Sequence, residues 1–69
     1  MMKNYYVNDH AQNSGEHEVH QDGCSHLPKL ENRTYLGVFD NCAEAVSEAS
    51  HIYSNVDGCY YCCNPCHNS

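Results

Sequence analysis

The chain has 69 residues and a formal net charge of −6 at pH 7, from nine acidic and three basic side chains. A chain of this length forms one domain and buries only about 60% of the surface that its unfolded form exposes, so its hydrophobic core alone is marginal. The negative charge argues against nucleic acid and against an anionic membrane surface as partners. No segment is apolar enough to span a membrane, and residues 1–10 lack the apolar run of a secretory signal. We therefore expect a cytoplasmic protein that does not bind membranes.

The first half of the chain contains the patterns of three strands. Residues 4–8 combine Tyr and Val between flanking Asn residues, which is typical of a short strand. Residues 16–20 follow a polar loop and predict the second strand of an antiparallel hairpin. Residues 34–39 form the strongest strand pattern, which we expect at the centre of the sheet, with a possible bulge at Gly37.

A helix is predicted after the third strand. Asn41 is a suitable cap, and Glu44 then occupies the third helical position of a capping-box arrangement. The pattern predicts that the helix frays near Asn55 and ends before Gly58. One face of this helix is apolar: Cys42, Ala45, Val46, Ala49, Ile52 and Tyr53. The fold class is therefore α+β, a hairpin plus a third strand packed on one α-helix, followed by a Cys-rich C-terminal segment.

Six cysteines in so short a chain predict a covalent or metal staple. In a reducing cytoplasm, clustered cysteines bind metal more often than they pair. A structural zinc takes four ligands, usually as two pairs. His20-x3-Cys24 and Cys59-x2-Cys62 are such pairs, one after the hairpin and one after the helix. We predict one Zn²⁺ site formed by His20, Cys24, Cys59 and Cys62, with Gly58 giving the backbone the freedom to form a tight turn around the second pair.

The C-terminal segment leaves alternatives open. Cys63-x2-Cys66 overlaps the second pair, so Cys66 or Cys63 could replace Cys62 as a ligand, and His26 is a further substitute for His20. Cys42 is expected to be a small buried core residue. The pattern does not decide whether Cys42, Cys63 and Cys66 are free, paired or bound to a second metal. The remaining histidines are expected at the surface or in packing: His10, His17, His51 and His67.

These motifs resemble the Ada-like zinc-binding module, the metal-binding domain of the Ada-type DNA methyl-phosphotriester repair protein and of nuclease-associated relatives. The resemblance covers roughly residues 17–66 and extends to stand-alone bacterial proteins without an assigned activity. The matching motifs are His20-x3-Cys24-x2-Leu27-Pro28, Asn32-Arg33-x-Tyr35, Phe39-x4-Glu44-Ala45 and Gly58-Cys59-x2-Cys62.

The resemblance implies a small α+β zinc domain with His20, Cys24, Cys59 and Cys62 as the ligands. The repair protein accepts the methyl group on the first cysteine of its first pair, and His20 occupies that place here. A neutral imidazole on zinc is a poor alkyl acceptor beside a thiolate, so we expect the self-alkylating chemistry to be absent. The basic DNA-contacting surface also has no counterpart, because the basic residues are only Lys3, Lys29 and Arg33.

Taken together, the sequence predicts one zinc-binding domain over residues 1–69, with residues 1–3 and 67–69 mobile. Its expected function is that of a structural zinc domain that binds a protein partner. The alternatives are a reactive-thiol protein, acting in redox chemistry or as an alkyl acceptor, and a zinc- or copper-handling protein that uses the Cys-rich tail. No complete catalytic constellation is found, so an enzyme is not expected. The sequence indicates neither the partner nor the oligomeric state.

Overall fold

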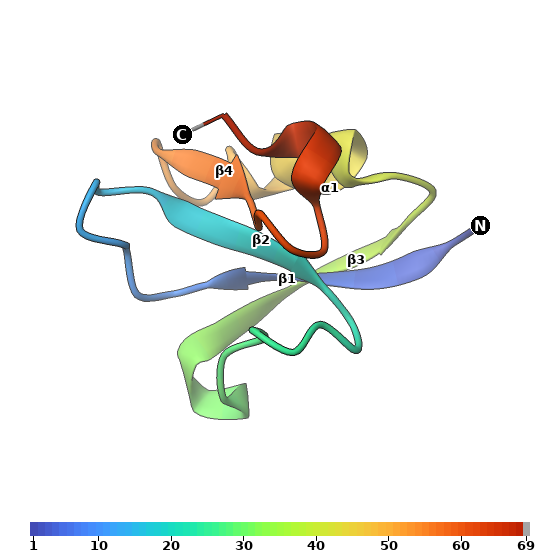
Figure 1. Cartoon of the computed structure of the whole chain (residues 1–69), viewed down its shortest axis with the longest axis horizontal. Coiled ribbons are helices and arrows are strands. Elements are labelled where there is room, and N and C mark those ends of the chain that lie inside the picture. Colours follow the sequence, from blue (N-terminus) through green and yellow to red (C-terminus); the bar gives the residue numbers. More distant parts are fainter. Residues whose placement is uncertain (69) are drawn as a thin grey trace.

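The structure, a computed structural model, describes residues 1–68 and shows a small α+β domain. The predicted fold class is confirmed: a mixed sheet of four strands packs on one α-helix, and the Cys-rich C-terminal segment folds over the same side (Figure 1). The elements in chain order are β1 (Lys3–Asn8), β2 (His17–Gln21), η1 (Leu30–Asn32), β3 (Arg33–Phe39), α1 (Cys42–Ala49), β4 (Val56–Gly58) and η2 (Asn64–Cys66).

The predicted hairpin is present. β1 and β2 pair antiparallel, with Tyr6 opposite His20 and Val7 opposite Val19. The strand order is β3-β1-β2-β4, so the expectation that the third strand is central was wrong. Strand propensity measures how well side chains suit a pleated surface, and it does not decide which strand has two neighbours. The pairing of β1 with β3 shifts register between Tyr5 and Tyr6, next to Gly37, so the expected bulge is found.

The fourth strand was not predicted. β4 is only three residues long and pairs parallel with β2, with His17 opposite Val56 and Val19 opposite Gly58. A segment with an Asp and a Gly in three positions has no strand pattern of its own. Its conformation depends on pairing with β2, a tertiary contact that the local sequence does not encode.

The helix begins as predicted and ends earlier. Asn41 caps α1 by accepting a hydrogen bond from the backbone N–H of Glu44 at 3.0 Å. The Glu44 carboxylate reaches back to the backbone N–H of Asp40 at 3.1 Å, one residue before the cap. The α-helix stops at Ala49, and Ile52, which was predicted on its apolar face, is 47% exposed.

The core lies between the sheet and α1. Tyr5, Val7 and Val19 point from the sheet toward Ala45 and Ala49, which are both fully buried. Leu36, Cys59 and Cys63 complete this core.

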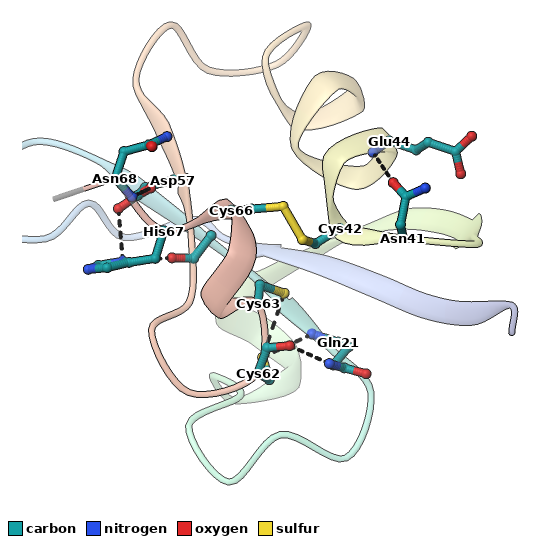
Figure 2. Close-up of a disulfide and its surroundings, with 11 residues drawn as sticks. Gln21, Asn41, Cys42, Glu44, Asp57, Cys62, Cys63, Cys66, His67 and Asn68 are labelled. Carbon is teal, nitrogen blue, oxygen red and sulfur yellow. Dashed lines mark hydrogen bonds and ion pairs between the residues drawn. A yellow bond between two sulfur atoms is a disulfide. The ribbon is translucent and has the colours of Figure 1, made fainter.

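Cys42 does not play the role of a simple buried residue that its helix position suggested. It is half-buried and forms a disulfide with Cys66 in η2 (Figure 2). Cys66 is 24 residues further along the chain, and only the packing of η2 against α1 brings the two sulfurs together. The disulfide therefore holds the C-terminal turn on the helix.

Both ends of the described chain make contacts. The Met1 ammonium contacts Asp40 at 2.8 Å, and the backbone N–H of Asn68 donates to the buried Asp57 carboxylate at 2.8 Å. His67 also lies 3.1 Å from Asp57 (Figure 2). Within the expected mobile C-terminus, Ser69 lies outside the described residues. Among residues 1–68, no helix has the length and apolar character needed to cross a membrane.

Candidate metal centre

The two predicted ligand pairs meet at one end of the sheet because β2 and β4 are parallel neighbours. Val19 is opposite Gly58, so the next residues, His20 and Cys59, lie side by side. The backbone N–H of Cys59 donates to the Val19 carbonyl at 2.9 Å and continues the ladder by one bond. The unpredicted strand is therefore the element that brings the two halves of the site together.

The second member of each pair is placed by a tight turn. After β2, the chain turns at Gly23, which has a φ of 88° that glycine adopts without strain, and the N–H of Cys24 bonds to the Gln21 carbonyl at 3.1 Å. After β4, the N–H of Cys63 bonds to the Cys59 carbonyl at 2.9 Å, which curls residues 59–63 into a turn. The two turns thus bring Cys24 and Cys62 close to each other and to the first members of the pairs.

The ligand atoms of His20, Cys24, Cys59 and Cys62 all lie within 4.8 Å of one another. Cys24 Sγ is 3.7 Å from His20 Nδ1 and 3.9 Å from Cys59 Sγ. A tetrahedral zinc with Zn–S of about 2.3 Å and Zn–N of about 2.0 Å has edges of about 3.8 Å between sulfurs and about 3.5 Å between sulfur and nitrogen. The two separations from Cys24 Sγ match those edges closely, and the four residues together could hold one metal ion.

Backbone amides surround the three sulfurs. The N–H of His26 donates to Cys24 Sγ at 3.4 Å, and the N–H of Tyr61 donates to Cys59 Sγ at 3.4 Å. The N–H of Gln21 donates to Cys62 Sγ at 3.3 Å, and the Gln21 side-chain amide donates to the Cys62 carbonyl (Figure 2). Such donors stabilise thiolates and orient metal ligands. Each sulfur of the group therefore has the partner expected for a charged ligand.

His20 is oriented by its position on β2. Its side chain is 1% exposed, with Nδ1 facing Cys24 and Nε2 facing Glu18 Oε1 at 3.7 Å. Nε2 has no hydrogen-bond partner among the described residues. Glu18 is two positions before His20, so both side chains lie on the same face of the strand. Glu18 thus faces the second nitrogen of His20 as an ion-pair neighbour, the type of group that commonly supports a metal-bound histidine.

The protonation states of these groups in the metal-free protein follow from their burial. Burial, with a contribution from His26, lowers the pKa of His20 to about 4, so the imidazole is neutral at pH 7 and available as a ligand. Burial raises the pKa of Cys24, and raises the pKa of Cys59 to about 12. The hydrogen bond with Cys63, together with burial, raises the pKa of Cys62. The three thiols therefore carry protons at pH 7 until a cation replaces them.

The alternative ligands are placed elsewhere. Cys66 is bonded to Cys42, so its sulfur is not a thiol in this structure. Cys63 is buried in the core with its sulfur 3.8 Å from that of Cys62, and it is not one of the four residues that come together. His26 contributes its backbone N–H to Cys24, while its ring stacks on Tyr61. Cys62 is therefore the better-placed member of the second pair.

The sequence pattern did not reveal the residues around the ligands. Glu18 and Gln21 lie on either side of His20, and both contact a member of the metal group. The alternation of Glu18 with His20 along the strand was the available signal, but it acquires meaning only once the histidine is taken as a ligand.

Comparison with protein-family models, with curated proteins and with solved structures gives no match for this chain. The site is therefore interpreted from its own geometry and chemistry.

Proposed function

We propose that this chain is a structural zinc-binding domain that uses a metal ion to hold together a surface for a protein partner. One observation carries the proposal: four ligand atoms from two segments 35 residues apart come within 4.8 Å of one another, and the separations of Cys24 Sγ from His20 Nδ1 and from Cys59 Sγ are of tetrahedral length. Three thiolates and one neutral imidazole form a donor set typical of closed structural zinc sites.

The donor set favours zinc over other ions. Thiolates are soft ligands and exclude magnesium and calcium, which require oxygen. A tetrahedral arrangement of three sulfurs and one nitrogen is typical of zinc, and four protein ligands leave no position for a reacting water. When bound, the ion would supply cross-linking rather than Lewis-acid catalysis.

The core supports a stabilising role for the ion. The buried apolar set consists mainly of Val, Ala and Cys, with Tyr5 and Leu36 as its largest members. Structural zinc contributes about 10–16 kcal/mol in small domains, which exceeds what such a core provides. Folding of this chain should therefore depend on metal.

The test is metal content by native mass spectrometry of the purified full chain, under conditions that keep the disulfide oxidised. We expect one zinc per chain, lost in both Cys24→Ser and Cys59→Ser, because each variant removes a ligand from a different pair. Ser47→Ala, an exposed helix position, is the matched control and should retain the metal. A wild-type protein that keeps a dispersed amide spectrum after chelation and contains no metal would refute the proposal.

The alternative functions have less support in the geometry. A reactive-thiol role requires an accessible thiol outside the metal group, but Cys63 is 1% exposed and Cys66 is in a disulfide. A metal-handling role requires ligands for further ions, and the described residues bring together one group of four. Binding of more than one zinc or copper ion per chain would favour the metal-handling role.

We also propose that this chain is related to the Ada-like module. The residues that carry the resemblance include the proposed ligands, and the module's self-alkylating cysteine corresponds to His20. We therefore expect that incubation of the zinc-loaded protein with a methyl donor leaves His20 unmethylated, which mass spectrometry can measure. A cytoplasmic location is likewise a proposal, and it requires the disulfide to persist against the thiol pool of that compartment.

A further inference from the structure

A row of four aromatic rings crosses the surface beside the metal centre. The rings follow one another in contact: His26 stacks on Tyr61 at 4.0 Å, Tyr61 meets Tyr60 edge-on at 5.2 Å, and Tyr60 meets His67 edge-on at 5.4 Å. We call His26, Tyr61, Tyr60 and His67 the aromatic row. The side chains come from three separate turns, so their contact is a product of the fold.

Three members of the aromatic row, His26, Tyr60 and Tyr61, are open to solvent, and His67 is 22% exposed. Tyr60 is 56% exposed and Tyr61 is 68% exposed. Both rings lie outside the core, although the core contains few large apolar side chains. Tyrosines are enriched in interfaces because they provide apolar area at low entropic cost and a polar tip. An exposed pair at right angles offers two ring faces to an incoming group.

The metal ligands determine where these rings lie. Tyr60 and Tyr61 occupy the two positions between Cys59 and Cys62, and the N–H of Tyr61 bonds to Cys59 Sγ. His26 is two residues after Cys24 and donates its N–H to that sulfur. Contact between His26 and Tyr61 therefore joins the turns that carry the two ligand pairs.

Charge identifies the kind of group that these rings attract. The chain carries −6, and a zinc with three thiolates adds about −1. Glu18, whose carboxylate faces His20 Nε2 at 3.7 Å, adds a further acidic group beside the proposed metal ligands. A ring face attracts cations through its quadrupole, and Arg or Lys is the usual partner.

We propose that the aromatic row binds an Arg- or Lys-bearing segment of a partner protein, with the cationic side chain against Tyr60 and Tyr61. The proposal rests on the proposed function, since the metal fixes the turns that carry the rings. A second copy of this chain is a poor occupant because two chains of charge −6 repel each other. Nucleic acid could stack on the rings, but its phosphates would meet the same negative field.

The experiment uses zinc-loaded full chain and a short fluorescent peptide of alternating Gly and Arg, followed by anisotropy and by amide chemical shifts. We expect shifts centred on residues 59–62 and 24–26. Binding should weaken as salt rises from about 0.02 M to about 0.5 M, because the interaction is electrostatic. The same peptide with citrulline in place of Arg, which removes only the charge, should bind at least about tenfold more weakly.

Variants distinguish peptide binding to the rings from attraction to the overall negative charge of the chain. Tyr60→Ser/Tyr61→Ser should weaken binding about tenfold, whereas Tyr60→Phe/Tyr61→Phe should retain it, because the ring faces remain. Tyr35→Ser is the matched control, since Tyr35 is 54% exposed on a strand away from these turns and should be neutral.

Equal binding by the citrulline peptide, or full binding by the double Ser variant, overturns the proposal. Tighter binding of a single-stranded oligonucleotide to the same rings overturns it in favour of nucleic acid. Native mass spectrometry of the same samples keeps the two hypotheses apart: a chain that holds zinc and ignores the peptide refutes the aromatic-row proposal alone.

Discussion

His20 illustrates how much of the proposed site depends on single side chains. It is buried on a strand, has one nitrogen facing a cysteine sulfur, and has the other facing a carboxylate. Its pKa of about 4 keeps it neutral over the physiological range. A buried neutral imidazole costs free energy when its Nε2 has no hydrogen-bond partner. Binding of a cation at Nδ1 would strengthen the attraction between Nε2–H and the Glu18 carboxylate, and so reduce that cost.

Glu18→Gln should weaken zinc binding about tenfold while leaving the fold intact, because it removes the negative charge that faces His20 Nε2. Competition with a chromophoric chelator measures this change. Glu48→Gln is the matched control, since Glu48 lies 3.7 Å from a histidine that is 71% exposed and far from the ligands in sequence. Equal affinities of the two variants would show that Glu18 does not support the histidine.

The protonation of the three thiols gives a pH prediction. Cys24, Cys59 and Cys62 have raised pKa values in the metal-free protein, so zinc binding at pH 7 should release about three protons, and His20 should release none. Affinity should therefore rise with pH and fall in acid. Calorimetry in buffers of different ionisation enthalpy measures the number of protons. A value near zero would mean that the metal-free thiols are already ionised.

At the scale of elements, β4 and η2 form the framework of the second ligand pair. Gly58 ends β4 and is buried under η2, where an added Cβ would lie 2.7 Å from the Cys63 carbonyl oxygen and 2.8 Å from Cys66 Cβ. Gly58 has no positive φ, so the close approach of η2, rather than the backbone freedom expected from the sequence, explains the glycine.

Gly58→Ala should therefore lower the free energy of unfolding by about 1–3 kcal/mol through overpacking against backbone atoms. Thermal unfolding of the zinc-loaded protein measures it. Because the clash displaces the turn that begins at Cys59, zinc affinity should fall as well. Ala43→Ser, at an exposed position in the first turn of α1, is a control that should change neither property.

The elements also show which parts of the fold the sequence encodes locally. The hairpin, the strand over residues 34–39 and the cap at Asn41 follow from alternation and capping chemistry, and all three are present. The parallel pairing of β4 and the Cys42–Cys66 disulfide depend on contacts between distant segments. The grouping of His20 with Cys59 could be anticipated from ligand spacing, but Glu18 and the aromatic row could not, because strand register and turn geometry place them.

At the scale of the whole molecule, two cross-links overlap along the chain. The proposed metal joins residues 20–24 to residues 59–62, and the disulfide joins Cys42 to Cys66. Their loops interleave, so each cross-link restricts segments that the other leaves free. A small core with two staples is the usual solution for a chain of this length.

Cys42→Ser/Cys66→Ser should lower the free energy of unfolding of the zinc-loaded protein by about 3.5 kcal/mol, the chain-entropy value for a sequence separation of 24. Because neither residue belongs to the metal group, zinc stoichiometry should stay at one per chain. Denaturant unfolding and native mass spectrometry measure the two properties. Loss of zinc in this variant would show that the two cross-links are not independent.

The interleaved loops have a further consequence for a cleaved chain. Lys29 and Leu30 are exposed in the connection after Cys24, and a trypsin cut between them would leave both disulfide cysteines on the larger fragment. Of the two cross-links, the proposed metal alone would then span the break, in addition to the strand pairings β1–β3 and β2–β4. The nicked protein should migrate as one particle with zinc and separate into two peptides when a chelator is added, so the ion would act as a reversible splice between two halves of one fold.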